Sequence, residues 1–293
     1  MVVKNRLFNM LLISFFISLF SWEFLYFSIG EGVVMGISIY LSCLFLRGWY
    51  LKVSRRTTFF NEIKSGIYLY LLPMIALFFY LVTLRTAASW DVSDSFSYTL
   101  LYLLLGIAWL SLSFSGMLLF WAFSYEDDVL MSQNRSSMIM LTGAVIGSSL
   151  IYAGANIGDG PGWWTVVFAG GLGTVSWLLL GMLINFTTGI INRITVDRDI
   201  NSGIRFSAYL VASGLILARG SAGNWLSFTR TIVDFTVAWP VLLMVILMIL
   251  FELLLFKPQE NRDQLNGKVA SIGVATLYLF FAIAVVATLP TIF

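Results

Sequence analysis

Long apolar runs, each close to the length of a membrane-spanning helix, follow one another along the chain and are separated by short polar elbows. About 20 apolar residues in a helix cross the roughly 30 Å hydrocarbon core of a bilayer. The runs lack the period-two alternation of membrane barrel strands, so they predict helices. We expect nine, at about 7–29, 33–51, 66–84, 96–123, 137–155, 163–191, 204–218, 228–256 and 269–292. The run at 204–218 is the shortest, because Arg205 and Arg219 bound it.

The layout is clearest in the stretch 134–220. Two short segments rich in small residues flank a long one, and a polar elbow with Asn or Gly precedes each short segment. Similar elbows at 62–67, 132–137, 199–204 and 263–268 each lie between a longer and a shorter run. We interpret residues 1–293 as one all-α membrane domain, in which an extra helix at 7–29 precedes four equally oriented hairpins at about 33–84, 96–155, 163–218 and 228–292. A shared need for Ser, Asn or Asp as helix N-caps would also make the elbows alike.

Basic residues predict the orientation. With the N-terminus in the cytoplasm, fourteen of the 17 Lys and Arg residues face the cytoplasm, and only Arg85, Arg219 and Arg230 face outward. This bias is typical of the positive-inside rule. We therefore expect a multi-pass protein of the bacterial inner membrane with a periplasmic C-terminus. Lys4 and Arg6 give the first run the start of a signal sequence, but its length indicates an uncleaved helix.

The densest basic patch is a candidate contact for anionic lipid heads. The same residues also serve the ordinary positive-inside topology. They are Arg47, Lys52, Arg55 and Arg56.

Composition excludes several classes of protein. Only 11% of the residues are charged, whereas a soluble domain has about 25%. The net charge of +2 gives no reason to expect nucleic-acid binding. With no His and with Cys43 as the one Cys, neither a disulfide framework nor a His/Cys metal site is possible. No phosphate-binding loop, dinucleotide signature or nucleophile–base motif is present, so we expect no enzyme and no cofactor.

Segments 134–147 and 163–220 resemble a bacterial inner-membrane family catalogued as domain of unknown function 350. In that family a polar loop and an Asn precede small residues and a Gly within an apolar helix. The stretch NRSSMIMLTGAVIG at 134–147 follows this pattern, whereas SGIRFSAYLVASG at 202–214 has Arg205 where the family tends to have Asn. The resemblance implies a polytopic fold in the inner membrane and no particular activity.

Ionisable residues inside a membrane are costly and are therefore candidate functional residues. Arg230 and Asp234 are four residues apart on one helix face, and Pro240 beyond them is expected to kink that helix. The acid next to a kink indicates a cation or proton site; an ion pair at the outer interface is the alternative. Glu23 is a second candidate, unless it is simply hydrated at the outer interface.

Other polar residues favour structural roles. Glu252 is interpreted as an acid that reaches the inner boundary. Asn185, with Thr187 and Thr188, is expected to hydrogen-bond between helices, with a solute site as the alternative. The acidic run at 126–128 is expected to be a solvated loop, or else to meet Arg193 and Arg198 or a cytoplasmic partner.

Small residues mark the expected contacts between helices. The alternative is a discontinuous helix at 170–173 that lines a cavity. The candidates are Gly143, Gly147, Gly170, Gly171, Gly173 and Gly181.

Two functions compete on this sequence. The first is a permeation or transport pathway for a small ion or solute. The second is a non-catalytic membrane-embedded subunit or scaffold. In both cases the bilayer is the main partner, with a second copy of the chain or other membrane subunits as further partners.

Overall fold

Helices account for almost all of the described chain. The computed structural model describes residues 27–60, 63–256 and 264–289, and no strand occurs in these ranges. The long helices are α2 (Ile29–Phe60), α3 (Ile63–Thr86), α5 (Phe96–Trp121), α6 (Arg135–Ala155), α7 (Trp163–Thr188), α9 (Ile200–Ser221), α11 (Pro240–Leu250) and α12 (Gln264–Thr288). Shorter elements are α4 (Trp90–Ser93), η2 (Tyr125–Met131), α8 (Ile190–Thr195), α10 (Phe228–Phe235), η3 (Thr236–Ala238) and η4 (Phe251–Leu255).

The chain is a polytopic membrane protein. Within the described ranges, 7 helices are long and apolar enough to cross a membrane, and up to 8 if one bent pair counts as a single span. That pair is α10–η3 with α11–η4, bent by 41° next to Pro240, so the predicted kink is confirmed. The expected helix at 7–29 lies almost wholly outside the described residues. The helix α9 extends beyond the predicted 204–218 at both ends and includes Arg205 and Arg219.

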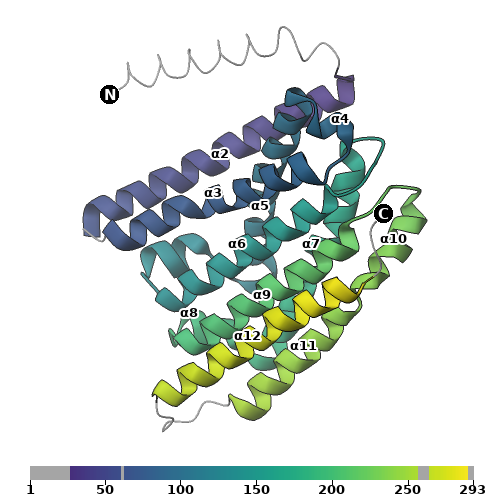
Figure 1. Ribbon diagram of the computed structural model, residues 1–293. Coiled ribbons are helices and arrows are strands. Elements are labelled where there is room, and N and C mark those ends of the chain that lie inside the picture. The colour runs from purple at the N-terminus through teal and green to yellow at the C-terminus, as the bar shows by residue number, and fades with distance from the viewer. Residues whose placement is uncertain (1–26, 61–62, 257–263, 290–293) are drawn as a thin grey trace.

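The helices form two rows that run in opposite directions. In one row α3, α6, α9 and α12 lie side by side in that order (Figure 1). In the other row α2 contacts α5, α5 contacts α7, and α7 contacts α11. The helices of one row are parallel, because residues later in one helix contact residues later in its neighbour. Between α3 and α6, for example, Tyr68 contacts Thr142 and Tyr80 contacts Ser149. We call the end where α6 and α9 begin the Glu252 end, and the opposite end the Asp234 end.

The closest helix pair is α6 with α9, at the centre of its row. A side-chain carbon added at Gly147 would lie 2.3 Å from the carbonyl oxygen of Leu210, and one added at Gly154 would lie 2.3 Å from that of Ala218. The two backbones therefore touch, which only glycine allows at these positions. Small residues let membrane helices approach closely and gain dispersion contacts where apolar burial provides no drive.

Both helices of this pair begin at a side-chain cap. Asn134 Oδ1 accepts hydrogen bonds from the backbone N–H groups of Ser136 and Ser137, at 2.9 and 3.4 Å. Asp199 accepts from Asn201 N at 3.0 Å and from Ser202 N at 3.1 Å. The Asn134 amide also donates to Ile194 O at 2.7 Å, which joins the start of α6 to the end of α8. Capping of free N–H groups explains why these elbows share Asn, Asp and Ser.

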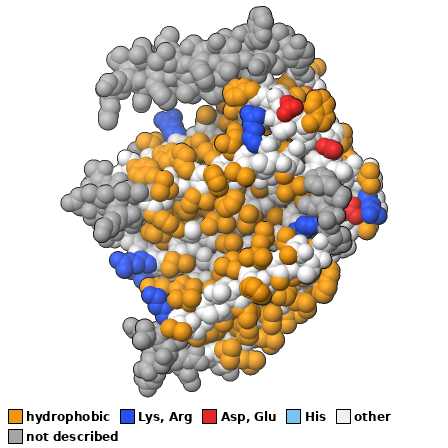
Figure 2. All heavy atoms as spheres, in the orientation of Figure 1, with side chains coloured by type: hydrophobic (Ala, Val, Ile, Leu, Met, Phe, Trp, Pro, Cys, Tyr) orange, Lys and Arg blue, Asp and Glu red, His pale blue; other side chains and the backbone are white. Residues whose placement is uncertain are grey.

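The outer surface is suited to lipid. Hydrophobic side chains cover a broad band of the face in Figure 2, and charged side chains lie toward its margins. The large exposed apolar side chains include Tyr40 on α2, Leu119 on α5, Phe186 on α7 and Phe280 on α12. Exposed apolar surface of this extent marks contact with another apolar phase.

Substitution of glycine by alanine distinguishes glycines at a helix contact from a glycine that faces open space. We expect Gly147→Ala to lower the free energy of unfolding by about 1–3 kcal/mol, because the new carbon overlaps the α9 backbone. Gly171→Ala on α7 has nothing within 4 Å of the new carbon and is the matched control. It is expected to be neutral or to stabilise by up to about 1 kcal/mol. Thermal unfolding in detergent measures both, and equal effects would contradict the packing argument.

Candidate functional site

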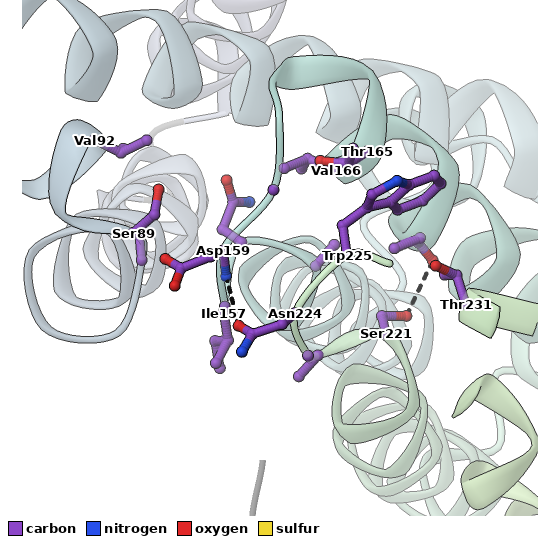
Figure 3. A pocket seen from close by; sticks show the side chains of 18 of the residues that line it. Ser89, Val92, Ile157, Asp159, Thr165, Val166, Ser221, Asn224, Trp225 and Thr231 are labelled. Carbon is purple, nitrogen blue, oxygen red and sulfur yellow. Dashed lines mark hydrogen bonds between the residues drawn. The ribbon is translucent and has the colours of Figure 1, made fainter. Parts of the chain in front are cut away.

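Three loops meet at the Asp234 end, after α3, α6 and α9. Gly158 N donates a hydrogen bond to Ala87 O at 3.4 Å, and Gly223 N donates to Ile157 O at 2.9 Å. Asp159 N donates to Asn224 Oδ1 at 2.8 Å (Figure 3). Gly158 has φ +109°, and a side-chain carbon there would lie 2.6 Å from Gly223 O. The glycines of these loops therefore permit the loops to pack against each other.

These loops form a pocket together with the first turn of α7 and the end of α10. Its polar lining comes from Asn156, Asp159, Thr165 and Ser221, with Asp234 at its edge. Figure 3 shows Asp159 and Asn224 beside one another on two of the loops. The pocket leaves about 50 Å³ for water molecules. One water needs about 10–15 Å³ of such space, so the pocket suits a small ion or a few waters.

The predicted pair of Arg230 and Asp234 is confirmed. Arg230 Nε lies 3.0 Å from an oxygen of Asp234, with the two side chains 58% and 44% exposed. This exposure makes the pair weak, at about 0–1 kcal/mol. Asp234 therefore remains accessible from the pocket that it lines. The other predicted acid, Glu23, lies outside the described residues.

A buried ion cluster lies near the opposite end. Arg205 of α9 binds Glu252 of η4 with two hydrogen bonds, from Nε to Oε1 at 2.5 Å and from Nη2 to Oε2 at 2.9 Å. Arg193 Nη1 of α8 lies 2.8 Å from the same carboxylate. Arg205 and Glu252 are each only 2% exposed. Two-pronged binding of this kind is the strongest ordinary contact between a guanidinium and a carboxylate.

Hydroxyl groups and an aromatic ring complete the cluster. Arg205 also donates to Ser271 Oγ on α12 at 2.7 Å and to Ser202 Oγ at 3.1 Å, and Ser202 in turn donates to Asp199 at 2.6 Å. The Phe256 ring lies 3.9 Å from the Arg205 guanidinium. The cluster thus joins α8, α9, η4 and α12. Glu252 lies in a π-helical turn, a distortion often found at functional sites.

The sequence interpretation of these charges was wrong. Arg205 was placed in a cytoplasmic loop, but it is buried inside α9. Glu252 was expected to reach the interface, but its side chain is fully buried between two arginines. The signal available in the sequence was a charged residue on each of two apolar segments. Because the two residues are 47 positions apart in the chain, their pairing had no local pattern.

Among the described residues, Asn185 hydrogen-bonds across the turn that joins α7 to α8 and not to a helix elsewhere in the bundle. Its Oδ1 accepts a hydrogen bond from Ile191 N at 3.0 Å, and its carbonyl accepts one from Gly189 N at 2.7 Å. Gly189 has φ +64° and separates α7 from α8. Thr187 and Thr188 bond to carbonyls within α7. The predicted contact between helices is therefore limited to the two consecutive helices α7 and α8, because the chain turns here and Asn185 caps the turn.

The glycine predictions have mixed outcomes. Gly143, Gly147, Gly170, Gly173 and Gly181 pack against other helices, so a side-chain carbon at any of them would crowd a neighbour. Gly171 has open space around it, and its expected packing role is wrong. The alternative of a discontinuous helix at 170–173 is also wrong, since α7 continues through it.

The basic patch and the acidic run meet each other. Lys52 forms an ion pair with Glu126 on η2, so the acidic run does not contact Arg193 through this residue. Arg47 is exposed, and the side chains of Arg55 and Arg56 lie outside the described part. Burial raises the pKa of the Asp128 carboxyl, and a hydrogen bond from Ser124 N opposes this shift.

Comparisons of the chain with protein-family models, curated proteins and solved structures found no match.

Removing the shared carboxylate tests the cluster. We expect Glu252→Ala to lower the free energy of unfolding by about 3–5 kcal/mol, because two arginines then stay buried without their acid. Asp234→Ala removes the acid of the exposed pair and is the control, with an expected loss below about 1 kcal/mol. Thermal unfolding in detergent compares them. Similar losses in the two variants would show that Glu252 is not buried among cations.

Proposed function

We propose that this membrane protein carries a small cation across the bilayer and that the pocket at the Asp234 end is the entry site. The observation that supports this most is the small polar pocket lined by Asp159 and Asp234. The helices α6 and α9 end at this pocket and direct the partial negative charge of their C-termini toward it. Two acids against Arg230 leave the site with an excess of negative charge, which favours a cation.

The ion cluster supports a closed arrangement at the other end. Because α6 and α9 touch along their length and the Arg205–Glu252 cluster joins α8, α9, η4 and α12, passage near these helices requires them to separate. Separation would break contacts of a buried carboxylate with two guanidinium groups. We propose that water or the transported ion replaces those contacts during passage.

Our proposal for the whole chain keeps the sequence interpretation. In this proposal the chain has nine spans, the first at 7–29, and its four hairpins are internal repeats. The parallel order of α3, α6, α9 and α12 supports such repeats. The N-terminus is cytoplasmic, the membrane is the bacterial inner membrane, and the chain is a non-enzymatic relative of the family catalogued as domain of unknown function 350.

A reporter fused after Phe293 tests the number of spans. With nine spans and a cytoplasmic N-terminus, a C-terminal alkaline phosphatase fusion is expected to be active and a fluorescent-protein fusion dark. The positive-inside bias is the physical reason. A fusion after residue 261, between the expected eighth and ninth spans, should give the opposite pattern and is the control. A bright fluorescent fusion after Phe293 would contradict the proposed topology.

Flux through vesicles tests the function. In proteoliposomes we expect wild-type protein to carry Na⁺, K⁺ or H⁺, and Asp159→Asn/Asp234→Asn to lower that flux about tenfold, which corresponds to about 1.4 kcal/mol of lost cation binding. Asp197→Asn is the matched control, because Asp197 is an exposed acid between α8 and α9, at the opposite end of the bundle. Flux equal to that of empty vesicles for all three ions would reject the proposal.

The second candidate function is a non-catalytic subunit of a membrane complex. The close contact of α6 with α9 favours it, since such a contact suits a rigid scaffold. Purification in mild detergent with light scattering would then give a mass above that of one 32.8 kDa chain, after detergent subtraction. A monomer of this mass would count against the subunit function.

A further inference from the structure

A second cavity lies between α2 and α5, near the Glu252 end. Its walls are mostly apolar and come from Phe45, Phe114, Leu118 and Phe123, and Ser115 also lines it. It has a volume of about 250 Å³, five times that of the Asp234 pocket. Leu118 and Leu119 beside it are 57% and 78% exposed on the lipid-facing side of α5. This lateral groove therefore opens toward the hydrocarbon phase.

The polar end of the groove carries both signs of charge. Glu126 lines it and forms an ion pair with Lys52, and the two side chains are 43% and 40% exposed. Lys52 also lies 5.5 Å from the centre of the Tyr125 ring. Both charged groups are therefore accessible at the place where the apolar walls end.

The groove is held in shape by its surroundings. Trp49 is fully buried and stacks on Phe114 and Tyr125, with ring centres 5.7 and 5.0 Å away. Ser124 Oγ accepts a hydrogen bond from Asp127 N at 3.2 Å and so caps η2, which carries Glu126. A preformed groove of this kind costs little ordering when a ligand binds.

We propose that the lateral groove binds one phospholipid with a primary-amine headgroup. An acyl chain fills the apolar part, the phosphate accepts hydrogen bonds from Lys52, and the ammonium donates to Glu126. An anionic lipid would meet the carboxylate of Glu126, whereas the zwitterion matches both charges.

Lipid exchange measured by native mass spectrometry tests this site. The full-length protein is placed in mixed micelles with equal amounts of dioleoyl phosphatidylethanolamine, phosphatidylcholine and phosphatidylglycerol. We expect one bound ethanolamine lipid at about five times the level of the choline lipid. The choline ammonium has no N–H group, and the loss of one hydrogen bond has about this effect.

Two variants distinguish binding of the lipid headgroup from binding of the acyl chain. Glu126→Gln is expected to remove the preference for ethanolamine over choline and to keep the bound lipid. Ser115→Phe, which fills the groove, is expected to lose the lipid, whereas Thr276→Phe on the exposed face of α12 keeps it. Circular dichroism checks that each variant is folded. If Ser115→Phe does not fold, the result for Glu126→Gln alone decides the test.

Three outcomes would overturn the proposal. They are equal retention of ethanolamine and choline lipids by the wild type, a preference for the glycerol lipid, and unchanged retention in folded Ser115→Phe. None of these readouts involves ion flux, so the groove can fail while the cation pathway stands, and the reverse is also true.

Discussion

The direct contact of the α6 and α9 backbones determines where the rest of the protein lies. In a bilayer, apolar burial does not drive helices together, so their association depends on packing and on polar contacts. Glycines at the contact bring the two helices close enough for carbonyl groups to fill the space of missing side chains. The neighbours α3 and α12 then add to this pair on either side, and α7 packs across it.

Charge is arranged differently at the two ends of this pair. At one end, two arginines share the buried carboxylate of Glu252 in a site that is largely closed to solvent. At the other end, acids face a pocket and the accompanying ion pair is open to water. A buried cluster of this kind is costly to desolvate, so its presence is weak evidence for added stability, even though removing one partner is strongly destabilising.

Much of the fold was predictable because a bilayer imposes simple rules on sequence. Length and apolarity predicted every described span, and Pro240 predicted the bend. The Arg230–Asp234 pair was also predictable, since four residues on one helix give a local pattern. The Arg205–Glu252 pair was not, because it depends on how two distant helices rotate. The role of Asn185 was not predictable either. The helix α7 ends before Gly189, so Asn185 caps the end of a helix where the sequence predicted a helix interior. The pocket loops meet mostly through backbone groups, which leave no trace in the pattern of side chains.

The break at Pro240 has a mechanical consequence. Asp234 and Glu252 both lie on the bent pair of helices, 18 residues apart in the chain, which corresponds to about 27 Å of helix length at 1.5 Å per residue. The segment between them is bent by 41°, and one arm carries an acid at the pocket while the other arm ends in the ion cluster. Rotation about the Trp239–Pro240 joint would move the two carboxylates relative to each other without breaking a regular helix. A single bent pair of helices thus connects the two ends of the bundle.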